Sequence, residues 1–384
     1  MKKILYLTFD GLLEPLGYSQ IISYLKNLSS NYNITVFSVE KKEDLKNFEH
    51  LQKIKEVLFN NNIQWKFFRY NKSSLYKYFL LIHLFVNILY IVIKKKIDII
   101  HSRSYVMGLI SYFLSFLIKF SHIFDIRGFW IEERIEWEIW KKNSLKYIFF
   151  KFIEPKIFFN SQAIVTLTND AKKELIKKKY KNIYVIPTSV KLNFLNKNKL
   201  ISRRIKFTHL GAIGTRYNFE FCLEIIKNIK KEKNIFLSII NKGEHKTIDN
   251  LLKKYNFKNT DFEIKYIKPY EVNSYIYPSD FGIFFPKKGF YLKAYFPTKL
   301  GEFLSCGIPV ITSKINDHVD NIIRENKIGV IIDDLDKIDL KKFNSEFSSM
   351  VNDKKVNERC ISVANRYFDI NKASLIYSKI YQNI

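Results

Sequence analysis

The chain has few cysteines, and they are widely separated. Its 384 residues include only 3, Cys222, Cys306 and Cys360, which form no C-x-x-C pair. This spacing excludes a disulfide framework and a zinc knuckle, and it fits a reducing cytoplasm. Glycine occurs 12 times and proline 8 times. No short repeat or low-complexity block appears, and the 47% hydrophobic and 16% aromatic fractions are those of a packed globular protein.

The chain also lacks a long apolar run. The start of the sequence is basic, but its apolar stretch is too short for a signal peptide and is expected to form a first buried strand. Residues 79–93 are the most hydrophobic stretch, yet they fall short of the roughly 20 residues that span a bilayer. Lysines bracket this stretch on both sides. We expect a buried helix of an α/β layer there, with a helix resting on an anionic membrane as the alternative.

Acidic residues are outnumbered by basic ones. The chain has 64 Lys and Arg against 37 Asp and Glu, which gives a formal net charge of +27. Such a surface suits a polyanion, an anionic membrane face or an anionic substrate. The alternative is that much of the excess is solvated lysine, because Lys, Asn and Ile abound together in this sequence.

Short β-branched and aromatic runs alternate with helical patterns along the whole chain, which is typical of βαβ units around parallel sheets. The expected strands are residues 3–9, 32–40, 63–70, 97–103, 122–127, 163–169 and 182–189, then 205–211, 234–243, 262–268, 280–287, 307–314 and 329–334. Between the two series lies 191–204, polar and basic, which we interpret as a linker. We therefore predict an α/β chain of two Rossmann-like, doubly wound domains facing across a cleft, residues 1–195 and 196–384. The helical region after Asn357 is expected to pack back on the first domain.

Two glycine pairs follow the first strand of each half. Gly11 and Gly17 follow the first strand of the chain, and Gly211 and Gly214 follow the strand that opens the second half. Ligands bind at the carboxyl ends of strands in open α/β sheets, where glycine lets a backbone approach a phosphate. Neither loop carries G-x-G-x-x-G, and no P-loop pattern occurs, so NAD and P-loop nucleotide sites are not indicated. The alternative is that these four glycines only allow the chain to turn and contact no ligand.

The stretch "FPTKLGEFLSCGIPVIT" carries more polar residues than a core helix needs. Pro297 suits the first turn of a helix, and Thr298, Lys299 and Glu302 fall on the side opposite the apolar stripe. Unpaired N–H groups and the helix dipole favour an anion there, and Lys299 adds a full charge. We predict a diphosphate at this helix start, with Glu302 accepting hydrogen bonds from a neighbouring pair of hydroxyls such as those of a ribose.

A second polar group lies at the end of an expected strand in the first half. Asp125 and Arg127 open the stretch "DIRGFWIEERIEWEIW", which holds three of the four tryptophans and several carboxylates. Aromatic faces beside carboxylates suit sugar recognition, and we predict that both residues contact a bound sugar. If a helix follows, one face carries Trp130, Arg134 and Trp137. The alternative for this helix is a core-facing aromatic stripe with solvated glutamates.

In these motifs the chain resembles the retaining glycosyltransferases of family four, which have the GT-B architecture. The resemblance covers nearly the whole chain in order and rests on "FDGLLEPLGYSQ", "HSRSYV", "FDIRGFW", "VIPTSV" and "FPTKLGEFLSCGIPVIT". It implies an acceptor-side first domain and a nucleotide-sugar donor domain second. It further implies that no cofactor beyond the UDP- or GDP-linked sugar is used.

The resemblance assigns roles to single residues. It implies that Glu302 holds the nucleotide ribose and that Thr298 and Lys299 contact the donor phosphates. Arg216 resembles the arginine that neutralises the diphosphate, and Gly17, with Gly11, matches the loop that closes over the donor. The chain departs from the family where Ala294 replaces a frequent acidic residue and where Tyr217 to Phe219 replace a usual lysine, so that Lys293 or Lys299 substitutes for it.

The function implied is transfer of a sugar to a saccharide or lipid-linked saccharide with retention of anomeric configuration. Lys299, Arg216 and the helix start stabilise the departing diphosphate, so no metal is expected. We expect surface polysaccharide or glycoconjugate synthesis of a bacterial type, in the cytoplasm or at the inner face of the cell membrane. Two alternatives stay open: a nucleotide-sugar 2-epimerase of the same fold, and a non-catalytic polyanion-binding protein. Nucleic acid is not an expected partner, because no DNA- or RNA-binding motif appears.

Overall fold

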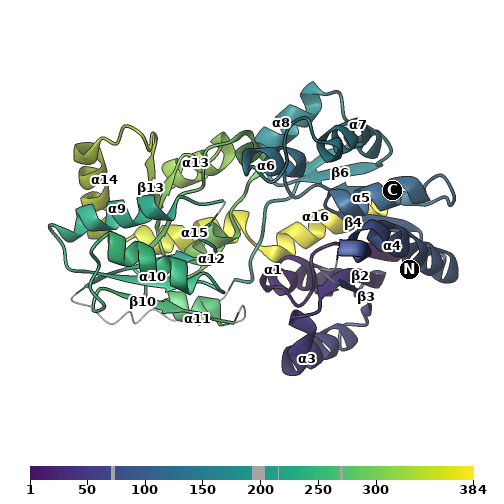
Figure 1. Ribbon diagram of the computed structural model, residues 1–384, viewed down its shortest axis with the longest axis horizontal. Coiled ribbons are helices and arrows are strands. Elements are labelled where there is room, and N and C mark those ends of the chain that lie inside the picture. Colours follow the sequence, from purple (N-terminus) through teal and green to yellow (C-terminus); the bar gives the residue numbers. More distant parts are fainter. Residues whose placement is uncertain (71–73, 193–203, 215, 269–270) are drawn as a thin grey trace. The chain divides into compact units, whose positions relative to one another are not determined.

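The computed structural model describes residues 1–70, 74–192, 204–214, 216–268 and 271–384 (Figure 1). They form two compact units. Residues Met1–Pro187 and Ile370–Ile384 make the first, here called the N-unit, and Thr188–Asp369 make the second, the C-unit. The boundary that the sequence predicts between residues 195 and 196 lies outside the described residues, so these domain limits stay a prediction.

A seven-stranded parallel sheet forms the middle of the N-unit, in the order β3-β2-β1-β4-β5-β6-β7. Its strands are β1 (Lys3–Thr8), β2 (Asn33–Lys41), β3 (Gln64–Tyr70), β4 (Ile99–Arg103), β5 (Ser121–Asp125), β6 (Ala163–Thr166) and β7 (Ile183–Val185). The register sets Leu5 between Thr35 of β2 and Ile100 of β4. Helices cover both faces of this sheet, which explains why the central strands read as nearly continuous apolar runs.

The helices of the N-unit lie in two layers. They are α1 (Pro15–Gly17), η1 (Tyr18–Ile22), α2 (Ser23–Leu28), η2 (Asp44–Lys46), α3 (Phe48–Phe59), α4 (Ser74–Lys95), α5 (Tyr105–Leu114), α6 (Trp130–Glu136), α7 (Leu145–Phe159), α8 (Asn169–Lys177) and α16 (Ile370–Asn383). Apolar side chains of α2, α3 and α16 share one core with β1 and β2, and those of α4 and α5 share the core on the opposite face. Side-chain caps fix several starts, as where Thr168 Oγ1 accepts from the Ala171 N–H, 3.0 Å away.

The C-unit repeats the same plan with six parallel strands in the order β10-β9-β8-β11-β12-β13. The strands are β8 (Ile205–Leu210), β9 (Ile235–Ile240), β10 (Phe262–Lys265), β11 (Phe281–Phe284), β12 (Val310–Ser313) and β13 (Gly329–Ile332). The helices are α9 (Phe219–Lys230), α10 (His245–Lys254), α11 (Val272–Ile276), η3 (Phe290–Ala294), α12 (Thr298–Ser305), α13 (Asp317–Glu325), α14 (Leu340–Asn352) and α15 (Val356–Tyr367). Stacked rings of Phe207, Phe281 and Phe347 fill part of its core.

Two parallel sheets with alternating helices confirm the predicted α/β class. In each unit the strand order reverses beside the first strand, between β1 and β4 in the N-unit and between β8 and β11 in the C-unit. Such a reversal leaves a crevice at the carboxyl ends of the strands, where ligands of doubly wound sheets bind. Within the described part of the chain, no helix combines the length and the apolarity that crossing a bilayer requires.

Candidate functional site

The loop after β8 and the helix α12 meet at the carboxyl edge of the C-unit sheet. Gly211 has φ +101°, and a Cβ built there would lie 3.5 Å from the Nζ of Lys299. The positive φ favours glycine at this position, whereas a Cβ would make only an ordinary contact with Lys299. Since β8 borders the reversal of strand order, the structure brings two separately predicted residues to the expected crevice.

Lys299 is the most unusual charge in this region. Its residue is 7% exposed, and within the described part of the chain its Nζ has no hydrogen-bond partner. Aromatic rings surround it instead, with the centroid of Tyr217 at 3.6 Å and that of Phe284 at 5.4 Å. Cation–π attraction offsets part of the desolvation cost, but an ammonium group carries three N–H donors that need acceptors. The amine is therefore suited to an anionic ligand.

Glu302 lies one helical turn after Lys299 on α12. It is half-buried, and burial raises the pKa of its carboxyl group to about 7, against the opposing effect of the Lys299 charge. Pro297 occupies the cap of α12 and gives no side-chain hydrogen bond to the first turn. The Leu300 N–H donates to the Pro297 carbonyl at 3.1 Å. The N–H groups of Thr298 and Lys299, which precede it in the first turn, have no acceptor within an α-helix and are suited to a ligand. Thr298, half-buried, is the first residue of the helix.

Hydrogen bonds from neighbouring segments fix the chain just before α12. The Nδ2 of Asn316 donates to the Leu292 carbonyl at 2.7 Å and to the Tyr295 carbonyl at 2.8 Å. The Oγ1 of Thr188 donates to the Phe296 carbonyl at 2.7 Å. These three bonds hold the entry to α12 from two separate segments, so the position of the helix start is set before any ligand binds.

The loop that carries Gly211 and Gly214 is tied to the end of β9. The Nδ2 of Asn241 donates to the Gly211 carbonyl at 3.1 Å, and the Ile213 N–H donates to Oε2 of Glu244 at 3.0 Å. A Cβ on Gly214, which is exposed, would lie 3.0 Å from the same carboxylate. The sequence analysis missed Asn241 and Glu244. The sequence did hold one indication of them, because Asn241 directly follows an expected buried strand, where ligand-binding residues of α/β sheets lie.

Arg216 is exposed, and the structure brings it to the same end of the sheet. Its carbonyl accepts from the Lys287 N–H at 3.0 Å, and Tyr217, the next residue, shares a 2.6 Å hydroxyl contact with Tyr295. Burial raises the pKa of Tyr295 well above its usual range, and the Arg216 charge acts against that rise. Arg216 therefore lies within electrostatic range of the residues that surround Lys299.

A second polar cluster lies at the carboxyl edge of the N-unit sheet. Asp125, the last residue of β5, is fully buried, and its Oδ2 lies 3.7 Å from Arg127 Nη1 and 3.7 Å from His101 Nε2. Burial alone would raise the pKa of Asp125, but Arg127, His101 and Arg103 outweigh it and hold the pKa below its usual value. Oδ1 has no hydrogen-bond partner among the described residues. The structure thus places Asp125 and Arg127 together, as a charged pair with an unused carboxylate oxygen.

Helix α16 completes this cluster. The hydroxyl of Tyr377 donates to Asp125 Oδ2 at 2.9 Å, and the hydroxyl of Tyr381 lies 2.6 Å from His101 Nδ1. Burial lowers the pKa of His101, although Asp125 acts in the opposite direction, so the imidazole is neutral at pH 7. The sequence analysis did not find the two tyrosines, because no local motif links them to a strand about 250 residues earlier.

The glycines of the first loop have a packing role in the N-unit. A Cβ on Gly11 would lie 2.6 Å from Oε2 of Glu40, and a Cβ on Gly17 would lie 2.4 Å from the Leu12 carbonyl oxygen. The buried Glu40 carboxylate accepts from the N–H groups of Leu12 at 2.7 Å and Leu13 at 3.3 Å. These two donors are already used, and the donor contact expected for Gly11 and Gly17 stays a prediction.

The aromatic stretch after Asp125 packs against its own unit. Trp130 stacks on Tyr105, with ring centroids 5.8 Å apart, and meets Trp140 edge-on at 4.9 Å. The guanidinium of Arg134 lies 5.1 Å from the Trp130 ring centroid, as expected for neighbours on one helical face. Helix α6 ends at Glu136, so Trp137 lies at its cap, and Trp130, Arg134 and Trp137 are all half-buried.

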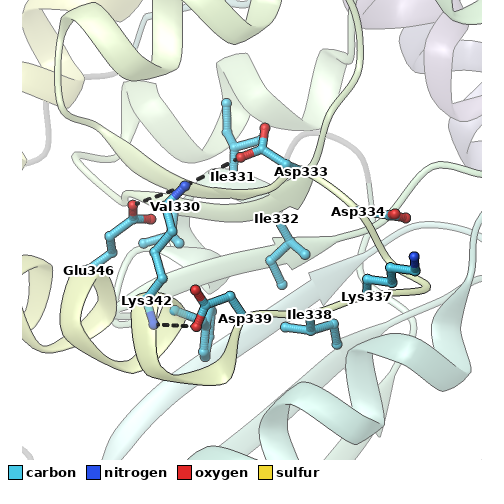
Figure 2. A pocket seen from close by; sticks show the side chains of 11 residues that line it. Val330, Ile331, Ile332, Asp333, Asp334, Lys337, Ile338, Asp339, Lys342 and Glu346 are labelled. Carbon is cyan, nitrogen blue, oxygen red and sulfur yellow. Dashed lines mark hydrogen bonds and ion pairs between the residues drawn. The ribbon is translucent and has the colours of Figure 1, made fainter.

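A pocket of about 260 Å³ opens between the end of β13 and α14, and it contains none of the predicted site residues (Figure 2). The Nζ of Lys342 lies between Asp333 and Glu346, 3.5 Å and 3.9 Å from their carboxylate oxygens. The adjoining Asp334-Leu335-Asp336 is a D-x-D tripeptide, which the sequence analysis overlooked when it expected no metal. Lys288 Nζ lies 3.0 Å and 2.9 Å from its two carboxylates. Within the described residues, no three His, Cys, Asp or Glu side chains gather as a metal site. We assign the pocket no role.

Comparison with known proteins finds a family model that matches part of the C-unit. Residues 226–364 match the family model described as glucosyltransferase 3-like, C-terminal domain. The fold is that of the GT-B glycosyltransferases. A search among curated proteins finds no match.

Solved structures share this fold along their whole length. Sucrose-phosphate synthase from Thermosynechococcus elongatus matches with a TM-score of 0.74 at 12% identity, covering 100% of this chain and 99% of that one. HepE from Anabaena, solved with UDP and glucose, matches with a TM-score of 0.72 at 10% identity and 100% coverage of both chains. A putative UDP-N-acetylglucosamine 2-epimerase from Listeria monocytogenes matches with a TM-score of 0.63 at 11% identity, covering 100% and 97%. At these identities the likeness shows the fold alone.

Proposed function

We propose that this protein is a glycosyltransferase that moves a sugar from a UDP- or GDP-linked donor to a saccharide or lipid-linked saccharide acceptor. The observation that carries the proposal is the buried Lys299 ammonium, without an acceptor, beside Gly211 at the start of α12. An anion completes this group better than any neutral ligand, and a diphosphate also suits the unpaired first-turn N–H groups. The match of residues 226–364 to a glucosyltransferase-like domain supports the same reading.

Different residues of the C-unit contact different parts of the donor in this proposal. Lys299, Arg216 and the first turn of α12 neutralise the diphosphate, and Thr298 contributes a hydroxyl at the same turn. The Glu302 carboxylate accepts hydrogen bonds from the ribose hydroxyls. The open backbone at Gly211 and Gly214 lets the phosphates approach closely. With this much positive charge around the leaving group, we propose that the reaction needs no metal ion.

The chemistry that follows is substitution at the anomeric carbon. As the bond from that carbon to the diphosphate oxygen breaks, the sugar gains oxocarbenium character and the diphosphate gains negative charge. Lys299 and Arg216 stabilise that charge most strongly when the bond is longest, which is what lowers the barrier. We propose that the acceptor hydroxyl attacks on the face that the diphosphate leaves and gives its proton to a departing phosphate oxygen. The product then keeps the configuration of the donor.

The cluster at the N-unit sheet edge has a matching role in the proposal. Asp125 is an ionised, fully buried carboxylate, and it holds the half-buried Arg127 guanidinium at the sheet edge. Arg127 supplies the neighbouring positive charge. We propose that this pair contacts the acceptor or the transferred sugar, in a cytoplasmic enzyme that makes a surface polysaccharide or another glycoconjugate.

Calorimetric titration with UDP, GDP and CMP in EDTA tests the donor site. We expect one nucleoside diphosphate to bind, and we expect Lys299→Met and Glu302→Ala to weaken that binding by at least about tenfold, as for a lost charge-assisted contact. Lys341→Met, on the exposed side of α14, is the matched control and should bind as the wild type does. Absence of binding by a folded wild-type protein would contradict the proposal.

The reaction type needs its own readout. NMR of the product made from a bound donor sugar should show the anomeric configuration of the donor, and inversion would refute the proposed geometry of attack. Turnover of the nucleotide-sugar in the absence of any acceptor, with a change of configuration at C2, would instead favour the 2-epimerase.

A further inference from the structure

The outer side of α4 carries an apolar stripe that the described residues leave exposed. Its inner side chains, such as Leu84 and Ile88, are fully buried against the sheet. The outer stripe consists of Phe79, Ile82, Val86, Tyr90 and Ile93, which are all 56–60% exposed. The spacings of three and four residues put these side chains on one side of the helix. The sequence predicted a buried helix here, and the structure buries only half of it.

Helix α7 carries a second stripe of the same kind. Its inner residues Ile153 and Ile157 are buried, and the outer ones are Leu145, Ile148, Phe149, Phe152 and Phe159. Leu145 is 86% exposed and Phe152 is 63% exposed. A polar outer face is the usual finding for a helix on an α/β sheet, so two parallel helices with apolar outer faces need a separate explanation.

The two stripes belong to one continuous surface. Helix α5 contacts both α4 and α7 and lies between them (Figure 1). A Cβ on Gly108 of α5 would lie 3.2 Å from Ile157 of α7, which shows how closely the helices approach. The end of α5 and the turn after it add the exposed side chains Phe113, Phe116 and Leu117. We call the exposed apolar side chains of α4, α5 with its following turn, and α7 the outer helical face.

The exposed charges on helices α4, α5 and α7 themselves are all basic. Helices α4 and α5 contain no Asp or Glu, and the single carboxylate of α7, Glu154, is buried. Glu154 is also occupied, because it accepts from the Tyr105 hydroxyl at 2.9 Å and from Lys151 at 3.1 Å. The exposed basic residues on these helices are Lys94, Lys146 and Lys156. The segments beside them add the exposed Lys96, Lys119, Lys141 and Lys142, against the three exposed carboxylates Asp98, Glu136 and Glu138. Basic groups therefore outnumber acidic ones by seven to three.

We propose that the outer helical face docks the protein on the surface of an anionic lipid bilayer. The apolar side chains enter the boundary between head groups and acyl chains, and the lysines contact anionic head groups. A second copy of this chain fits the face poorly, because a symmetric pair would bring together helices whose exposed charges are all lysines and whose single carboxylate, Glu154, is buried. Docking of this kind does not depend on the proposed donor site, and it is measured without any sugar transfer.

Flotation of the full chain with vesicles tests this proposal. The probes are vesicles of phosphatidylcholine alone and vesicles with one third phosphatidylglycerol. We expect at least about tenfold tighter binding to the anionic vesicles, since each lysine near an anionic surface contributes roughly a fivefold factor. The charge variant Lys94→Glu with Lys96→Glu should bind the anionic vesicles at least about tenfold more weakly than the wild type does. The apolar variant Ile82→Gln with Ile93→Gln should lose a similar factor at unchanged net charge.

The controls separate a specific face from the high net charge of the whole chain. Lys341→Glu with Lys354→Glu makes the same change of net charge on exposed residues of the C-unit. Phe48→Gln with Phe59→Gln removes exposed rings from α3, on the opposite face of the N-unit sheet. Both controls should keep binding within about threefold of the wild type. All variants change exposed side chains, so their melting temperatures should match the wild type.

Three results would overturn the proposal. The first is equal binding to both kinds of vesicle, or to neither. The second is an equal loss in the two charge variants, which would mean that only net charge matters. The third is a wild type that binds no vesicles and forms a concentration-dependent dimer in light scattering, while the apolar variant stays monomeric. That result would assign the face to a second copy of the chain.

Discussion

Replacing Glu302 by glutamine should stabilise the folded protein above neutral pH. Burial raises the pKa of this carboxyl group from 4.5 to about 7 in the folded state, while Lys299 acts against the rise. The unfolded chain releases the proton near pH 4.5, whereas the folded chain keeps it until about pH 7. Wild-type stability therefore falls as the pH rises through this window, and the loss is complete above it. Glutamine has no proton to release and escapes the loss.

The size of the effect follows from the two pKa values. At about 1.4 kcal/mol per pH unit, the interval corresponds to about 3 kcal/mol as an upper limit. The side chain is half-buried, so we expect about 2 kcal/mol in favour of Glu302→Gln at pH 8, and no difference at pH 4. The measurement is urea unfolding of both proteins at several pH values, with Glu325→Gln, an exposed carboxylate on α13, as the matched control.

A pH-independent difference, or a variant less stable than the wild type at pH 8, would refute the reasoning about burial. The binding of a nucleoside diphosphate should respond in the opposite sense. If ribose hydroxyls donate to the ionised carboxylate, wild-type affinity should fall as the pH drops below 7, and the variant should bind more weakly at pH 8. A residue that costs stability while it supports binding is typical of a functional site.

Three further perturbations test single contacts. Lys299→Met should keep or raise the melting temperature, because it removes a buried ammonium without a hydrogen-bond acceptor, and a drop of several degrees would mean that the cation–π contacts dominate. Tyr377→Phe should lower the free energy of unfolding by about 1 to 2 kcal/mol in urea, since it removes the hydrogen bond to buried Asp125, and a neutral effect would show that this bond contributes little. Gly17→Ala should cost at least about 2 kcal/mol through its 2.4 Å clash with a backbone carbonyl, whereas Gly243→Ala, which meets nothing within 4 Å, should be neutral.

The sequence predicted the α/β class because its apolar runs have the period and length of buried parallel strands. Each of the thirteen expected strand segments overlaps a strand of the two sheets. The sequence also predicted Gly211 directly after a strand and Lys299 at a helix start, and the structure has both there. The approach of these two residues to each other was not among the predictions. What the pattern of Thr298, Lys299 and Glu302 could not show is the aromatic surround of the ammonium, which depends on how β11 and the loop after β8 pack.

The remaining parts of the candidate site depend on contacts between distant segments. Tyr377 and Tyr381 lie on an ordinary amphipathic helix, and only its packing brings their hydroxyls to Asp125 and His101. The role of Glu40 in holding the first glycine loop was equally hidden, because a carboxylate inside a strand gives no local signal of its partners. Such contacts are set by tertiary packing and have no period in the sequence.

The shared core of α16 and the N-unit has a consequence for how the protein is made. A ribosome completes β1 to β7 long before it reaches Ile370–Asn383, and the whole C-unit is synthesised in between. Until that helix emerges, the core that includes Tyr24 and Ile34 lacks the apolar side chains that α16 contributes to it, and Asp125 lacks its hydrogen bond from Tyr377. The N-unit therefore cannot finish folding on its own during translation, and its polar cluster is assembled only after the C-unit has been made. A nascent chain stopped before residue 370 should expose apolar surface and attract chaperones.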